Sequence, residues 1–240
     1  MISRLVASLL ALTACYAAAR PLDTDDTGTV ARGQWELEGG VDFVRTGNLR
    51  TFAFTPVAAY GVTERLQFDF ACDYIIETES GHADIHLFNP ALQLKWLMWE
   101  HEERGTSLGL KANLGHPVHA RGPSIDFDAG GHFRLLLTQS LGPVELDLNA
   151  GYDFVGAWGT GDDDGFMTSV ALRRAVNERL TLMGEIVGHH PQRGGASDGM
   201  IAFAVKYSRG DGWHWDALVG TGLGRGAPDF RAVIGFVREL

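Results

Sequence analysis

The stretch Val144–Val155, with the sequence VELDLNAGYDFV, alternates apolar and polar side chains along its length. Successive side chains of a β-strand point to opposite faces, so a strand here has one apolar face and one polar face. The stretch is about twelve residues long, whereas a globular strand averages about 5–6 residues and a membrane-spanning strand about 9–11. This length and alternation predict a strand that lies between lipid and water. The apolar face carries Val144, Leu146, Leu148, Ala150, Tyr152 and Phe154, and the other face carries Glu145, Asp147, Asn149, Gly151 and Asp153.

The same period of two recurs along the chain and predicts an all-β fold, an antiparallel up-and-down transmembrane β-barrel of about twelve strands. An even number of strands brings both ends of a barrel to the same side, and tight turns alternate here with longer loops, as in bacterial outer-membrane barrels. Pro56 is a local misfit, because proline cannot donate to a neighbouring strand. The expected strands are 34–44, 49–60, 66–74, 85–98, 107–116, 127–140, 144–155, 166–173, 180–188, 201–207, 213–223 and 230–236, with loops at 77–84 and 117–126 among the longer connections.

The charge balance and the cysteine content exclude several kinds of partner. The 240 residues include 20 Lys and Arg against 30 Asp and Glu, a formal net charge of −10, whereas a nucleic-acid-binding surface needs clustered basic residues. Two cysteines give neither a disulfide framework nor a zinc-binding spacing. The adjacent His189 and His190 lack the i, i+4 spacing of a helical metal pair. We therefore expect no nucleic-acid partner, no metal and no cofactor.

The amino terminus has the features of a signal peptide. A basic start at Arg4, an apolar core and the small residues Ala17–Ala19 precede Arg20. Cleavage after Ala19 is the favoured reading, and it removes one arginine, which changes the net charge to −11. The alternative is a lipoprotein signal at Leu12–Cys15, which would make Cys15 the lipidated first residue.

No stretch of the remaining chain is long and apolar enough to cross a membrane as a helix. A closed barrel is the other structure that satisfies every backbone group in lipid. The expected organisation is therefore a signal peptide (1–19), an irregular N-terminal lead-in or small plug (20–33) and a barrel (34–240) in the bacterial outer membrane. Its expected partners are the lipid bilayer and lipopolysaccharide.

Aromatic residues on the apolar faces fall at the strand ends nearest the short turns. Amphipathic rings are enriched at the depth where lipid meets water, and outer-membrane barrels carry such rings in girdles. A soluble sandwich has no reason to place its tryptophans at one level. The expected girdle consists of Trp35, Tyr60, Trp96, Tyr207, Trp213 and Trp215.

Several short motifs resemble a known family. The segment Arg20–Thr29 (RPLDTDDTGT) resembles the opening of mature proteins in the outer-membrane family of the phenol meta-pathway (MetA-pathway of phenol degradation), whose members are often described as candidate transporters. The turn Tyr60–Leu66 (YGVTERL), its echo Val176–Leu180 (VNERL) and Gly226–Asp229 (GAPD) are similar to recurring turns of that family. One departure is the final Leu240, where an aromatic residue is usual. The resemblance implies a setting in aromatic-hydrocarbon uptake.

The polar faces of the strands supply the candidate lining of the lumen. Charges in a narrow interior usually pair, and Arg173 lies between the strands of Glu145 and Glu185, as Lys206 lies between those of Glu185 and Asp216. Asp23, Asp25 and Asp26 either bind a cation, fold into the lumen as a small plug, or form a solvated turn. The residues expected to face the lumen are Glu38, Asp69, Lys95, Lys111, Arg134, Glu145, Asp147, Arg173, Glu185, Lys206 and Asp216.

These features together predict a channel or transporter for small, hydrophobic or aromatic solutes, and no enzymatic activity. A barrel of about twelve strands is wider than the about eight that side chains just fill. One alternative is a structural or adhesive barrel without transport. Another is an outer-membrane lipid hydrolase, since that chemistry needs a nucleophile beside a base. Candidate pairs are Ser197 with His189 or His190, and Ser124 with His116 or His119.

Overall fold

The structure is a computed structural model of the chain. It describes residues 21–79, 82–115, 118–121, 124–127, 130–155, 164–192, 197–224 and 227–240, and within 82–89, 118–121, 124–127 and at 155 it describes the backbone alone. The expected signal peptide (1–19), with Cys15, and His116 lie outside the described residues.

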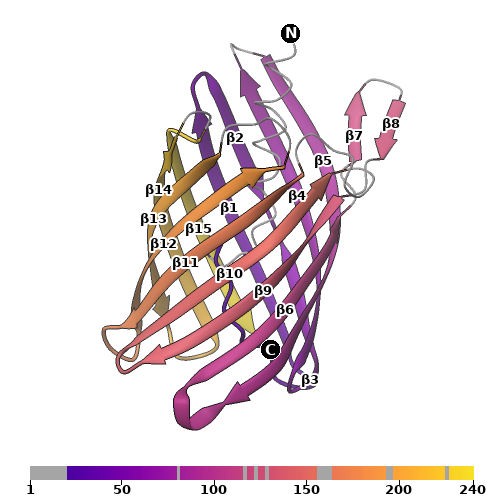
Figure 1. Cartoon of the computed structure of the whole chain (residues 1–240). Helices are drawn as coiled ribbons and strands as arrows, with labels where there is room; N and C mark the ends of the chain where they lie inside the picture. Colours follow the sequence, from indigo (N-terminus) through magenta and orange to yellow (C-terminus); the bar gives the residue numbers. More distant parts are fainter. Residues whose placement is uncertain are drawn as a thin grey trace.

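Within these ranges, twelve antiparallel strands form one barrel wall (Figure 1). Two of the labelled strands, β2 and β3, lie end to end and both pair with β1 and β4, so together they make one strand interrupted at Thr55 and Pro56. The missing N–H of Pro56 accounts for the interruption. The strands are β1 (Trp35–Thr46), β2 (Leu49–Phe54), β3 (Val57–Thr63), β4 (Leu66–Glu79), β5 (His82–His101), β6 (Thr106–Gly115), β9 (Gly130–Leu141), β10 (Val144–Val155), β11 (Gly165–Ala175), β12 (Leu180–Pro191), β13 (Asp198–Ser208), β14 (Trp213–Leu223) and β15 (Phe230–Glu239).

The sheet closes because the first strand pairs with the last. β1 runs antiparallel to β15 in a register that places Glu36 opposite Glu239. Trp35 and Leu240 exchange backbone hydrogen bonds of 3.4 and 2.8 Å. A closed sheet leaves no edge strand unpaired. The predicted all-β, antiparallel up-and-down barrel is confirmed.

Several strands, among them β4, β5, β12 and β13, extend farther than the sequence predicts. The expected loop 77–84 is wrong, because β4 continues to Glu79 and β5 begins at His82, with Ile76 opposite Ile85. The expected loop 117–126 instead contains a hairpin of β7 (Val118–Arg121) and β8 (Ser124–Phe127), and β9 begins at residue 130 rather than 127. On β4, Ile75 is buried and Ile76 is exposed, so the alternation continues, but the register shift between Asp73 and Tyr74 hides it in the sequence.

The outer face of the wall carries apolar side chains and the inner face carries polar ones, the reverse of the arrangement in a soluble protein. On β10, Leu148 is 40% exposed, whereas Asp147 and Asn149 beside it are buried. Hydrocarbon around a barrel requires an apolar outer belt of this kind. No helix among the described residues is long and apolar enough to cross a bilayer. The exposed apolar residues of the belt include Phe52, Phe70, Leu92, Leu135, Leu172, Ile201, Phe203, Val219 and Ile234.

Candidate functional site

The candidate site is built around residues 21–33, which precede β1 and lie inside the barrel. We name this stretch the inner segment. Leu22, Thr24, Asp25 and Thr27 are buried in it. Side chains of eight strands form hydrogen bonds or ion pairs with it, and the backbone carbonyl of Gly61 in β3 accepts from the N–H of Gly33 at 2.7 Å, so the inner segment crosses the interior. The wall partners are Gln67 (β4), Lys95 (β5), Ser107 and Lys111 (β6), Thr138 (β9), Asn149 (β10), Arg173 (β11), Glu185 (β12) and Arg231 (β15).

The last part of the inner segment, residues 29–33, lies at the end of the barrel with the short turns. There Arg32 forms a β-bridge with Gly61, and Gly61 leaves no room for a side chain, because an added Cβ would lie 2.1 Å from the carbonyl oxygen of Ala31. Thr29 Oγ1 donates to the carbonyl of Glu64 at 3.0 Å. At its other end, Leu22 packs in an apolar cluster with residues of β11 to β15.

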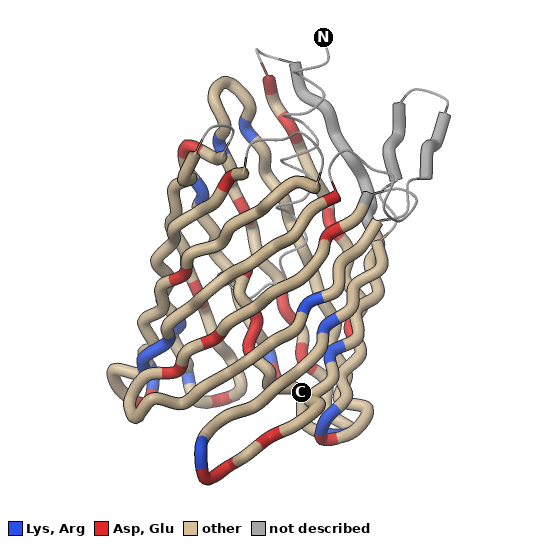
Figure 2. Tube along the Cα trace, in the orientation of Figure 1, with Lys and Arg blue, Asp and Glu red and all other residues tan. Residues whose placement is uncertain are grey.

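A row of three cations on neighbouring strands faces the inner segment. Lys95 of β5 lies opposite Lys111 of β6, which lies opposite Arg134 of β9, and all three side chains are buried. Figure 2 shows blue Lys and Arg positions side by side on neighbouring strands of the wall. The Lys111 Nζ is 2.8 Å from Asp25, and the Lys95 Nζ is 3.0 Å from Asp26. We name Lys95, Lys111 and Arg134 the cation row.

The charge of Asp25 is stabilised by this row. Burial by itself raises the pKa of the Asp25 carboxyl, but the charges of Lys111, Lys95 and Arg134 and the hydrogen bond from Lys111 outweigh burial and lower the pKa from 3.8 to about 2. Opposite charges within about 4–6 Å favour the ionised form in this way. Asp25 therefore carries its negative charge at any ordinary pH.

Arg173 joins the inner segment to the wall a little nearer the short turns. Its guanidinium lies 3.1 Å from Asp26, 2.6 Å from Asp147 and 3.6 Å from Glu145. Asp147 is 1% exposed and also accepts a hydrogen bond of 2.7 Å from the hydroxyl of Thr138. The expected neighbour Glu145 is thus found beside Arg173, and Glu145 itself is half exposed near the mouth.

Glu185, the other expected neighbour of Arg173, binds the inner segment instead. Its carboxylate accepts hydrogen bonds from the backbone N–H groups of Asp23 and Thr24 at 3.1 and 3.0 Å, and from the Thr24 hydroxyl at 2.9 Å. On the other side of Asp23, Arg231 lies 2.6 Å from its carboxylate and 2.8 Å from Asp42. Asp23 is therefore held by Glu185 through its backbone N–H and by Arg231 through its carboxylate, and its carbonyl accepts from Arg134 at 3.5 Å.

Uncharged polar residues on the inner face complete the site, and sequence reasoning missed them. Asn149 accepts from the Asp25 N–H at 2.7 Å and donates to the Asp25 carbonyl at 2.8 Å. Thr138 accepts from the Thr27 N–H at 3.1 Å, and Gln67 accepts from the Val30 N–H at 2.8 Å. All three lie at inward positions of the period-two pattern. An amide or hydroxyl side chain at an inward position is therefore the sequence signal that could have identified them as partners of the inner segment.

The remaining residues expected in the lumen have other surroundings. Glu38, Asp69 and Asp216 are buried, and Lys206 is half-buried opposite Asp216 across β13 and β14. Asp69 accepts a hydrogen bond of 2.7 Å from Gln67.

The six aromatic residues expected in the girdle all lie on strand ends near short turns. Trp35 and Tyr60 pair across β1 and β3 with ring centroids 4.8 Å apart, and Trp213 stacks on Trp215 at 6.0 Å. Tyr207 lies opposite Trp215, and Trp96 lies opposite Leu66. Trp99, 45% exposed, was not expected, because a register shift between Leu97 and Trp99 breaks the alternation.

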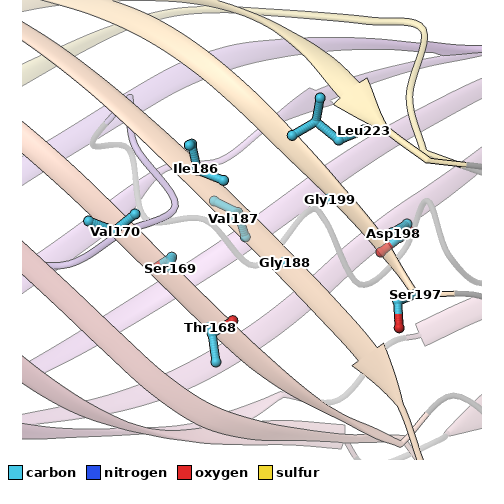
Figure 3. A pocket seen from close by; sticks show the side chains of 10 residues that line it. All are labelled: Thr168, Ser169, Val170, Ile186, Val187, Gly188, Ser197, Asp198, Gly199 and Leu223. Atoms are coloured by element: carbon cyan, nitrogen blue, oxygen red, sulfur yellow. The ribbon is translucent and has the colours of Figure 1, made fainter.

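A shallow depression of about 510 Å³ lies on the outer face of β11 to β14 (Figure 3). Gly188 of β12 lies opposite Gly199 of β13, so two lipid-facing positions lack side chains. At its edge, Ser197, one of the lining residues, has its Oγ 3.2 Å from His190 Nδ1, so one pair considered for lipid hydrolysis is in contact. For the other pair, Ser124 and His119 lie on β8 and β7, where the structure gives the backbone alone.

In the described part of the chain, no group of three or more His, Cys, Asp or Glu side chains is arranged to hold a metal ion. The ion pairs and hydrogen bonds given above form a network between the inner segment and the wall.

Comparison with known proteins gives structural likeness without sequence likeness. No protein-family model matches the chain, and no curated protein sequence matches it. The COG4313 outer-membrane channel from Pseudomonas putida F1 has a similar structure, with a TM-score of 0.68 and 13% identity over 91% of this chain and 100% of that one. The KdgM porin has a TM-score of 0.61 and 9% identity, over 85% of this chain and 99% of that one. The CymD monoaromatic hydrocarbon channel has a TM-score of 0.55 and 9% identity, over 87% of this chain and 89% of that one. At these identities the likeness shows that the chain has the fold of outer-membrane channel barrels.

Proposed function

We propose that this protein is a channel of the bacterial outer membrane that lets small solutes cross, and that the inner segment restricts its lumen. The observation that carries the proposal is the way this segment is attached. Hydrogen bonds and ion pairs to polar inward side chains hold it, and a peptide held in this way can leave without breaking a covalent bond. The similar structures are described as channels and porins, which supports the same reading.

The solutes we propose are small and aromatic or hydrophobic. Support comes from two sources, the motifs that resemble the phenol meta-pathway family and the likeness to a channel described as one for monoaromatic hydrocarbons. Asp23, Asp25 and Asp26 would then close the route of the solute. The residues that would line this route are Glu38, Asp69, Lys95, Lys111, Arg134, Glu145, Asp147, Arg173, Glu185, Lys206 and Asp216.

The test is solute flux through the protein with and without the inner segment. The full chain and a variant lacking residues 22–30 are reconstituted in planar bilayers, and the conductance is measured. We expect the deletion to increase the conductance severalfold, because it removes the carboxylates and backbone that cross the interior. Arg209→Gln, at the exposed turn between β13 and β14, is the control and is expected to behave as the unmodified chain. A deletion variant that folds but conducts no better than the bare bilayer would leave a structural barrel as the better explanation.

The membrane setting is part of the same proposal. The apolar belt would face acyl chains, the aromatic girdle would mark the periplasmic interface, and lipopolysaccharide would surround the end with the longer connections. Residues 1–19 would be removed on export, with cleavage after Ala19. Heat-modifiable mobility of the membrane-extracted protein on gels is the measurement, because folded barrels in detergent migrate differently from the unfolded chain.

A lipid hydrolase is the second candidate, favoured only by the contact between His190 and Ser197. Hydrolysis also needs donors for the oxyanion. Esterase activity of the purified protein that disappears in Ser197→Ala would favour this candidate, and we expect no such activity.

A further inference from the structure

The cation row places like charges directly opposite one another on three adjacent strands. Lys95, Lys111 and Arg134 are cross-strand neighbours, and like charges in such positions destabilise a sheet. They are also buried, at 2%, 3% and 8% exposure, and a buried charge is costly unless it is paired. Such a row is stable when anions lie against it.

The wall supplies only part of the required negative charge. Asp153 lies 3.6 Å from Arg134. Asp147 is engaged with Arg173, and Asp69 accepts from the amide of Gln67. The ion pairs of Lys95 and Lys111 are instead with Asp26 and Asp25 of the inner segment.

We infer that the cation row is a binding site for the carboxylate of a small organic anion, and that Asp25 and Asp26 occupy this site while the inner segment is in place. The inference deepens the proposed function, on which it rests, by naming the chemical class of the solute. When the segment moves aside, the two buried ammonium groups lose their carboxylates, and Arg134 keeps Asp153 and loses the backbone carbonyl of Asp23. A solute carboxylate restores these interactions, whereas a neutral solute of the same shape leaves the cations unpaired.

The residue types fit this role. Each lysine presents three donors on a flexible stem, and the arginine presents a planar fork that matches the two oxygens of a carboxylate. The inner segment already shows the geometry, since two carboxylates one residue apart contact two strands of the row at 2.8 and 3.0 Å. The acidic segment thus acts as an internal competitor of an acidic solute.

The test is the binding of benzoate and of its neutral isostere benzamide to the detergent-solubilised full chain, by titration calorimetry. The double variant Asp25→Asn/Asp26→Asn removes the resident carboxylates and leaves the row intact. We expect it to bind benzoate about ten- to a hundredfold more tightly than benzamide, the range for a hydrogen bond to a charged group. Adding Lys111→Gln should abolish the preference.

The matched control is Lys206→Gln in the same background, because Lys206 is another inward lysine and lies opposite Asp216, away from the row. It should keep the preference for benzoate. Each variant must show heat-modifiable mobility, and Lys95→Gln replaces Lys111→Gln if the latter does not fold. Equal affinities for the two ligands, no binding of either, or a preference that survives both row substitutions would overturn the inference.

The outcomes separate this inference from the proposed function. Benzoate selectivity at the row without any conductance in bilayers would support the anion site and contradict the channel. Conductance of the deletion variant without benzoate selectivity would support the channel and contradict the anion site.

Discussion

The Nζ atom of Lys111 lies 2.8 Å from the carboxylate of Asp25, a residue 86 positions earlier in the chain. This contact ties the inner segment to the wall at a buried position. Asp25→Asn should loosen the segment, because loss of one partner of a buried ion pair costs about 3–5 kcal/mol. The expected result is a severalfold rise in conductance in planar bilayers. The control is Asp211→Asn, in an exposed pair with Arg209 at 3.4 Å, which should change nothing. Equal conductance of the two variants would show that the Asp25 contact does not hold the segment.

Acid should release the same contact within a defined pH range. The pKa of Asp25 is lowered from 3.8 to about 2, so its folded state favours the ionised form. The stabilisation is complete above pH 3.8 and is lost as the pH falls through about 2. Conductance should therefore contain an acid-induced step between about pH 4 and pH 2 that Asp25→Asn lacks. Identical pH profiles of the two proteins would contradict the assignment.

Arg173 should contribute strongly to stability. Its guanidinium neutralises Asp147, which is 1% exposed, at 2.6 Å. Arg173→Gln leaves that carboxylate buried without its cation and should lower the free energy of unfolding by about 3–5 kcal/mol, measured by urea titration in lipid vesicles. Adding Asp147→Asn should recover part of the loss. Arg174→Gln, at the exposed neighbouring position of β11, should change the value by about 0.5 kcal/mol or less.

The apolar belt should tolerate charge poorly at its middle. Phe203 is half exposed and is the sixth of the eleven residues of β13. Phe203→Arg should destabilise the barrel by about 2–4 kcal/mol, whereas Tyr207→Arg, on the same face near the short turn, should cost about 0–1 kcal/mol from the charge. Urea titration in vesicles measures both. If the larger effect occurred at Tyr207, the belt would not be centred where we place it.

The mass of the exported protein should identify its first residue. Cleavage after Ala19 gives a chain that starts at Arg20 and contains Cys72 as its only cysteine. Processing as a lipoprotein would add the mass of acyl chains to Cys15. Intact-mass spectrometry of the membrane fraction distinguishes these products, and we expect the unmodified chain from Arg20.

The barrel itself was predictable because lipid imposes a simple rule on every strand. In Val144–Val155 each apolar side chain alternates with a polar one, and the structure pairs this stretch with β9 and β11 in an unbroken register. The rule fails where the register shifts. The shift that precedes the pairing of Ile76 with Ile85, and the bulge that turns Trp99 outward, had no counterpart in the periodic pattern.

The period-two pattern predicts on which face a residue of the site lies, and it does not predict the contacts of that residue. Period two assigns a residue such as Glu185 to the inner face, but it gives neither the height of that residue in the barrel nor the path of a segment inside it. Arg173 was expected between Glu145 and Glu185, yet Glu185 accepts from the backbone of Thr24. Strand tilt shifts residues of neighbouring strands along the axis, so sequence position alone cannot match them.

The span of the inner segment from wall to wall has a mechanical consequence. The segment connects strands that lie far apart in the wall, such as β5 through Lys95 and β12 through Glu185, so it cross-links the barrel. If the segment leaves the lumen on opening, as we propose, these cross-links are lost in the same step. We therefore expect the open barrel to deform more easily than the closed one.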